Sequence, residues 1–175
     1  MKGFLVVMMG KGMFPTFNQE KLEDKLYFQY GNNDIKQGDI VLLVTSSKCD
    51  PQKDLYIKRI IGLPGERIAF ENGKVYVINK EHPTPGIILD ESDYLSPSVK
   101  TFKNPTQNDG LRFEEKLVGQ NEYFFMGDNR GGSTDSRICG LGQKEAILGR
   151  AFFRVTPEEK RGFVKLPKYN IGNLD

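Results

Sequence analysis

Short runs of branched and aromatic residues, separated by Gly, Asn, Asp and Pro, recur along most of this chain. Runs of this kind, bounded by turn residues, are typical of β-strands. Between two of them, Asn72-Gly73 predicts a tight hairpin, because both turn positions tolerate a positive φ. The first run, residues 4–9, is wholly apolar, which predicts a buried strand. Strands are predicted over 4–9, 39–44, 55–61, 67–70, 74–78, 122–126 and 149–155, and residues 143–148 are expected to form one short helical turn.

Residues 81–119 differ from the rest of the chain. They contain four prolines, many polar residues and little periodicity. We interpret this stretch as a loop-rich lobe inserted into a β core that comprises residues 1–80 and 120–155. Residues 156–175 are predicted to form a peripheral C-terminal tail. The predicted fold class is therefore mostly β, with one inserted lobe.

Composition narrows the chemistry. The 175 residues include 25 Lys and Arg against 23 Asp and Glu, and this net charge of +2 gives no support to a nucleic-acid partner. A single histidine and two cysteines argue against a His/Cys metal cluster, and we expect neither a metal nor a cofactor. A catalyst based on histidine would depend entirely on His82, which lies in a Pro-rich loop.

The cellular compartment is less constrained. The apolar run 4–9 is far shorter than the roughly 20 residues of a spanning helix, and it lacks the small-residue cleavage site of a signal peptide. Cys49 and Cys139 are compatible with a disulfide outside the cell and with free thiols inside it. The sequence leaves both alternatives open.

The first segment with unusual chemistry is 10–17, directly after an apolar run. Gly10 and Gly12 allow the backbone to approach another group closely, and Pro15 fixes the exit of the segment. The alternative interpretation is an ordinary Gly/Pro turn after an edge strand.

The second segment is the predicted strand 55–61, which carries a lysine. Alternation along a strand places Lys58 on the same face as Tyr56 and Ile60. Burial disfavours the ammonium form, so we expect the pKa of this lysine to lie below about 10.4. A neutral amine can accept a proton from a hydroxyl, which makes Lys58 a candidate general base. The alternative is a surface lysine that snorkels.

The third segment is 126–137, in which eight of twelve residues have polar side chains. So many hydrogen-bonding groups indicate a buried polar junction, in which Asp135 and Arg137 pair and Ser133 bonds a neighbouring amine. The alternative is a cluster of Asx and Gly turns.

In combination, these segments resemble bacterial signal peptidase I. The matching motifs are Met-x-Pro-Thr at 13–16, Gly-Asp-Ile-Val at 38–41, Lys-Arg-x-x-Gly-Leu-Pro-Gly at 58–65, and Gly-Asp-Asn-Arg-x-x-Ser-x-Asp-Ser-Arg at 127–137. The resemblance extends from about residue 4 to residue 155, and the middle lobe is its variable part. It implies the antiparallel β-sheets of the signal peptidase and LexA-like Ser-Lys protease fold.

The resemblance also implies roles for individual residues. In that family, a serine directly before Met-x-Pro-Thr attacks the peptide bond after a small-x-small signal, and a lysine is the general base. Lys58 matches that base, and Ser133 matches the serine that orients it. The resemblance gives substrate-binding or structural roles to Gly10, Met13, Pro15, Asp128, Asp135 and Arg137.

One departure from the family pattern affects catalysis directly. Gly12 stands at the position of the nucleophilic serine, and glycine has no hydroxyl with which to form an acyl-enzyme. Neither the adjacent Lys11 nor Thr16 can replace it. Three explanations stay open: an engineered change, a natural pseudoenzyme, or a fragment or variant of a working enzyme.

The function implied by the resemblance is removal of signal peptides from secreted preproteins. Extended peptides would bind by strand addition, with small pockets selecting Ala-like side chains. The expected location is the extracytoplasmic side of the bacterial cell membrane, held by an anchor absent from this chain. The alternative function is a non-catalytic protein that binds peptides or assists surface-protein assembly. An autoproteolytic repressor-like domain is disfavoured, because no helix-turn-helix region or cleavage linker precedes the core.

Overall fold

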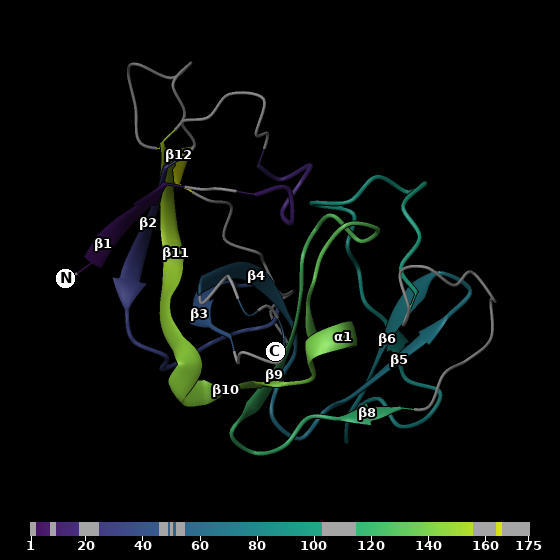
Figure 1. Cartoon of the computed structure of the whole chain (residues 1–175). Coiled ribbons are helices and arrows are strands. Elements are labelled where there is room, and N and C mark those ends of the chain that lie inside the picture. Colours follow the sequence, from purple (N-terminus) through teal and green to yellow (C-terminus); the bar gives the residue numbers. More distant parts are fainter. Residues whose placement is uncertain are drawn as a thin grey trace.

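Antiparallel β-strands make up most of the chain in the computed structural model, which describes residues 3–7, 10–17, 25–45, 49, 51, 55–102, 115–155 and 164–165. The strands form two sheets, drawn at the left and the right of Figure 1. The predicted mostly-β class is confirmed. None of the helices among the described residues has the length and apolar character that a membrane-spanning helix requires.

The larger sheet carries the candidate chemistry. Its order over the described residues is β1-β2-β11-β3-β4-β9-β10, and β12 pairs with β11. These strands are β1 (Gly3–Val7), β2 (Lys25–Tyr30), β3 (Ile40–Val44), β4 (Leu55–Gly62), β9 (Glu122–Met126), β10 (Gly142–Gln143), β11 (Ile147–Val155) and β12 (Val164–Lys165). β4 lies between β3 and β9, and the register pairs Lys58 with Val41 and Arg59 with Met126. Lys58 is therefore in the middle of the sheet.

The smaller sheet contains the predicted hairpin. Its order is β7 (Ile87–Ile88), β6 (Lys74–Ile78), β5 (Arg67–Glu71) and β8 (Lys116–Leu117). Asn72 and Gly73 turn the hairpin with φ values of 52° and 75°, as the Asn-Gly pair predicts. β7 and β8, which come from the 81–119 stretch, flank this hairpin on its two sides.

The side chains of β4 alternate between different parts of the core. Tyr56 and Ile60 belong to a cluster with β3 and β9 residues, whereas Ile57 packs against a cluster that contains Met13. The period of two that the sequence predicts for this strand is confirmed. Lys58 lies on the Tyr56 face.

Other expectations were wrong or incomplete. The first strand is Gly3–Val7, and its side chains alternate between exposed and half-buried, so it is not a buried strand. The reason is its place at the edge of the sheet, where Leu5 and Val7 are 45% and 48% exposed. Met8 and Met9 lie outside the described residues. β2 and the short helix α1 (Ser136–Cys139) were not predicted, whereas the expected helical turn is the 3-10 segment Lys144–Ala146.

A disulfide joins Cys49, in the connection after β3, to Cys139 at the end of α1. The two cysteines are separated by 90 residues in sequence. The two cysteines are therefore paired and are not free thiols.

Removing this disulfide should lower the free energy of unfolding by about 2–5 kcal/mol. The bond closes a long loop and thereby reduces the conformational entropy of the unfolded chain. Urea unfolding of a Cys49→Ala/Cys139→Ala variant, compared with the oxidised parent, would measure the effect. The parent in a thiol reductant should match the variant. Equal midpoints for the oxidised parent and the variant would contradict the prediction.

Candidate active site

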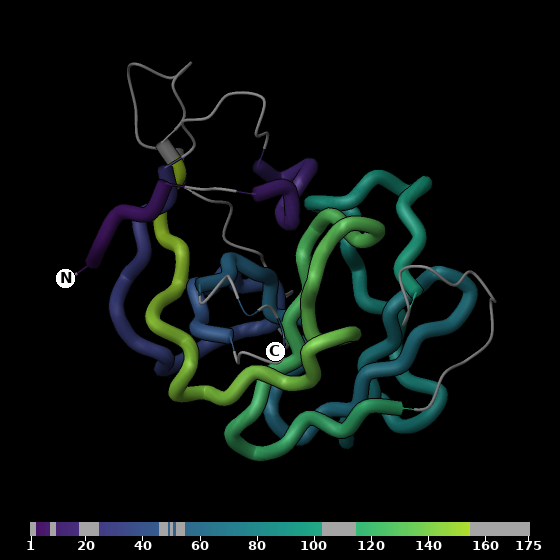
Figure 2. The backbone as a smooth tube through the Cα atoms, in the orientation of Figure 1, coloured from purple at the N-terminus to yellow at the C-terminus, as the bar shows by residue number. Residues whose placement is uncertain are grey.

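The segment 10–17 lies against the loop that follows β9. Figure 2 shows the purple segment beside the green loop. The Asn129 N–H donates to the Gly12 carbonyl at 3.1 Å, and the Asn129 amide Nδ2 donates to the Lys11 carbonyl at 3.0 Å. Met13 is 1% exposed and anchors the segment in the core beside Phe17. Two of the motifs are thus joined by one backbone and one side-chain hydrogen bond.

Lys58 projects from β4 into this junction. Its side chain is buried, and its Nζ donates to Ser133 Oγ at 2.9 Å. The ammonium position is also 4.9 Å from the centre of the Tyr56 ring. The surface-lysine interpretation is therefore wrong, and the structure brings Lys58 and Ser133 together as the polar-junction interpretation predicts.

Gly12 faces the same amine. A Cβ built on Gly12 would lie 2.9 Å from Lys58 Nζ and 3.7 Å from Ser133 Oγ. Gly12 does not adopt the left-handed conformation that would require glycine, whereas the exposed Gly10 does, with a φ of 99°. Any side chain at position 12 would consequently point at the lysine amine.

Asp135 fixes the loop that carries Ser133. Its carboxylate accepts two bonds from the Arg137 guanidinium, at 2.8 and 2.7 Å, and one from the Gly127 N–H at 3.1 Å. Both charged side chains are 0% exposed. Asp135 is also the N-cap of α1, where it accepts from the Arg137 N–H. The predicted Asp135–Arg137 pair is observed, and it holds both ends of the Ser133 loop.

A second buried ion pair lies on the other side of the loop. Asp128 accepts two bonds from Arg59, at 2.8 and 2.7 Å, and a further bond from the Thr16 hydroxyl. Arg59 in addition donates to the Gly38 carbonyl at 2.9 Å. These contacts bring segments 10–17, 38–41, 58–65 and 127–137 to one place. Pro15 is exposed, and its peptide bond with Phe14 is cis.

Comparison with known proteins identifies the family. The sequence model of the family "Signal peptidase, peptidase S26" matches residues 4–156. The chain belongs to this family. It is 36% identical to Signal peptidase I P of Bacillus subtilis subsp. natto over 145 residues, which cover 82% of this chain and 71% of that protein. It is 26% identical to Signal peptidase IB of Staphylococcus aureus over 152 residues, 85% of this chain and 75% of that protein.

Among solved structures, a signal peptidase I from Enterococcus faecalis V583 covers 67% of this chain and 97% of its own chain, at 23% identity and a TM-score of 0.46. Four short motifs indicate the family in the sequence analysis. The family model, which matches residues 4–156, establishes the membership.

The sequence analysis missed several residues of this candidate site. Arg59 and Thr16 bind Asp128, although neither was given a role in advance. An arginine in the interior of a buried strand is a signal for Arg59, because such a charge requires a partner. Glu91 and Tyr94 come from the 81–119 stretch and contact Arg130. Their sequence context carries no comparable signal.

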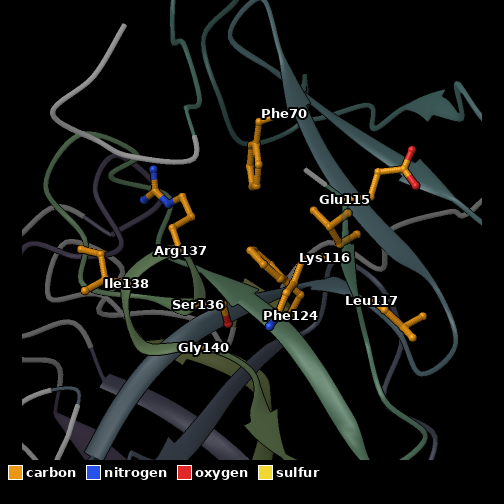
Figure 3. Close-up of a pocket in the computed structure, with 10 residues that line it drawn as sticks. Phe70, Glu115, Lys116, Leu117, Phe124, Ser136, Arg137, Ile138 and Gly140 are labelled. Carbon is orange, nitrogen blue, oxygen red and sulfur yellow. The ribbon is translucent and has the colours of Figure 1, made fainter. Parts of the chain in front are cut away.

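A separate cavity of about 500 Å³ lies between α1 and strands β5, β8 and β9. Figure 3 shows the aromatic side chains of Phe70 and Phe124 on opposite sides of it, with Arg137 and Ile138 on the α1 side. Neither Lys58 nor Ser133 lines it, but Arg137 does, so the cavity adjoins the candidate active site without containing the Lys58 amine. In the described part of the chain, no three His, Cys, Asp or Glu side chains are grouped to hold a metal.

Replacing Gly127 by alanine should disrupt the candidate site. A Cβ there would collide with Ser133 Oγ and with the Gly12 carbonyl oxygen, which is rigid backbone. We expect a loss of about 1–3 kcal/mol in the free energy of unfolding, as for other overpacked positions. Urea unfolding measures it.

Gly131→Ala is the matched control, because a Cβ at Gly131 has no neighbour within 4 Å. This control should change the free energy of unfolding by less than about 0.5 kcal/mol. Equal stabilities for the two variants would contradict the predicted contact between residues 127, 133 and 12.

Proposed function

We propose that this chain is a signal peptidase I-type serine endopeptidase domain in which Gly12 occupies the position of the nucleophile. With glycine at this position, the domain is inactive. The observation that carries the proposal is the direction of position 12. A Cβ at that position lies 2.9 Å from Lys58 Nζ, so a serine hydroxyl there would be within reach of the amine.

The surrounding groups support a general-base role for Lys58. A neutral amine would take the proton from a hydroxyl at position 12 as that oxygen attacks the peptide carbonyl, and would return the proton to the leaving amine. Ser133 holds the amine at 2.9 Å, which fixes its direction toward position 12. The backbone N–H of residue 12 is the donor we assign to the oxyanion. These contacts support the proposed general-base role of Lys58.

Signal peptides of secreted preproteins are the proposed substrates, because the chain belongs to the signal peptidase family. An extended peptide would bind by adding a strand, with small pockets for Ala-like side chains. The proposed setting is the extracytoplasmic face of the bacterial cell membrane. The Cys49–Cys139 disulfide supports an oxidising compartment.

A second candidate function is non-catalytic peptide binding or assistance of surface-protein assembly. The observation that favours it is Gly12 itself, since a site that only binds has no use for a nucleophile. This candidate uses the same residues but requires no turnover.

Restoring the hydroxyl separates the two candidates. The Gly12→Ser variant should cleave a signal-peptide substrate, and adding Lys58→Ala should abolish that cleavage. Mass spectrometry of the products should place the cut after a small-x-small sequence. If Gly12→Ser stays inert while fluorescence anisotropy shows that it binds the peptide, the non-catalytic function replaces the peptidase proposal.

A further inference from the structure

Tyr94, from the 81–119 stretch, lies against the buried arginines of the site. Its ring centre is 3.8 Å from the Arg59 guanidinium carbon and 5.8 Å from that of Arg130. The two arginines are 0% and 2% exposed. A ring face attracts cations, and the attraction is stronger where water is excluded. Tyr94 therefore contacts the guanidinium of Arg59 on β4 and that of Arg130 in the loop after β9.

Glu91 completes this contact. Its carboxylate accepts from the Tyr94 hydroxyl at 2.7 Å and pairs with both Nη atoms of Arg130. Thr101 Oγ1 accepts from Arg130 Nη1 at 2.6 Å. Burial by itself lowers the pKa of Arg130. The hydrogen bond to Glu91 and the charge of Glu91 oppose this effect, and the net pKa lies above its ordinary value. Burial and the Glu91 charge also raise the pKa of Tyr94, which keeps its hydroxyl a donor.

The two arginines hold the turn that touches position 12. Arg59 binds the Asp128 carboxylate, and Arg130 Nε donates to the Gly127 carbonyl at 3.2 Å. In the same turn, directly after these two anchor points, the Asn129 N–H donates to the Gly12 carbonyl. The position of Gly12 relative to Lys58 thus depends on a turn that Arg59 and Arg130 hold, and both of these arginines lie against the Tyr94 ring.

We propose that Tyr94 is a positioning residue for the active site. Tyr94 and Glu91 fix the positions of the Arg59 and Arg130 side chains. These arginines hold the turn 127–130, and the turn in consequence holds residue 12 against the Lys58 amine. Tyr94 touches none of the reacting atoms. The catalytic part of this inference rests on the proposed function, whereas the structural part does not. The 81–119 stretch is then a component of the site and not an accessory to it.

The kinetic test uses the Gly12→Ser background. Tyr94→Ala should lower kcat by about 10²-fold, the effect expected of a displacement near 1 Å at the reacting groups, with little change in KM. Tyr94→Phe keeps the ring over Arg59 and should retain most of kcat. Tyr27→Ala, which removes a tyrosine that is 41% exposed on β2, is the matched control and should leave kcat unchanged. A kcat for Tyr94→Ala equal to that of the control would overturn the proposal.

A second measurement does not depend on activity. Hydrogen exchange of the Asn129 amide in the unchanged chain reports the bond to the Gly12 carbonyl. Tyr94→Ala should increase the exchange rate of this amide by at least about tenfold, and Tyr27→Ala should not. If Tyr94→Ala does not fold, Tyr94→Leu, which fills the space without an aromatic face, carries the same test.

The two measurements separate the two proposals. An inert Gly12→Ser protein whose Asn129 amide responds to the Tyr94 change would refute the peptidase function and support the positioning role. An Asn129 amide that exchanges at the parent rate in Tyr94→Ala, or in Tyr94→Leu where the Ala variant does not fold, would refute the positioning role, whatever the activity.

Discussion

A serine at position 12 should raise the kcat of this chain toward a signal-peptide substrate by about 10⁴-fold or more, the scale on which serine peptidases depend on their nucleophile. The geometry supports a gain of this size, because the added Cβ lies beside the amine of Lys58, the proposed base, which Ser133 already holds. The 2.9 Å contact between that Cβ and Lys58 Nζ requires a shift of the amine. The far end of a flexible lysine can make such a shift.

Gly12→Ala is the matched control for this gain. It introduces the same Cβ beside Lys58 but no oxygen, so it should remain at the rate of the unchanged chain. Initial rates with an internally quenched peptide measure all three proteins. Equal rates for the Ser and Ala variants would show that position 12 does not supply a nucleophile.

The second large effect is expected from Asp128→Ala, which should cost about 3–5 kcal/mol in the free energy of unfolding. Asp128 and Arg59 are both 0% exposed, and removing the carboxylate leaves a buried guanidinium without its counter-charge. The Thr16 hydroxyl would lose its partner as well. Urea unfolding with a linear extrapolation measures this loss.

The Arg67–Glu115 pair provides the comparison. Its N–O distance of 2.9 Å is similar, but its side chains are 43% and 22% exposed. Glu115→Ala should therefore cost only about 0–1 kcal/mol, because water screens the pair. Similar losses for Asp128→Ala and Glu115→Ala would contradict the assignment of a buried, uncompensated charge.

The parts of the structure that follow from local pattern were predictable. Alternation alone places Lys58 beside Tyr56 on β4, and Asn72-Gly73 alone indicates the hairpin turn. The burial of the first strand was not predictable in this way, because the apolar run carries no information on whether the strand lies at an edge of the sheet.

The candidate site also contains both residues that local sequence pattern predicts and residues that only the fold brings together. Ser133 and Asp135 lie within a single polar segment that marks itself as unusual. Tyr94 contacts Arg59, which lies 35 positions earlier in the sequence, and neither the neighbours of Tyr94 nor this spacing indicates the contact. The pairing of Cys49 with Cys139 likewise depends on how β3 and α1 lie in the folded chain. The spacing of the two cysteines in the sequence does not predict it.

The disulfide has a consequence for chain continuity. The proposed base, at residue 58, lies on the Cys49 side of any backbone cut between residues 59 and 132, and Ser133 lies on the Cys139 side. A protease that nicks the 81–119 stretch would consequently produce two fragments that remain one molecule, and each fragment would carry half of the Lys58–Ser133 pair. On a gel, the two halves would separate only after reduction.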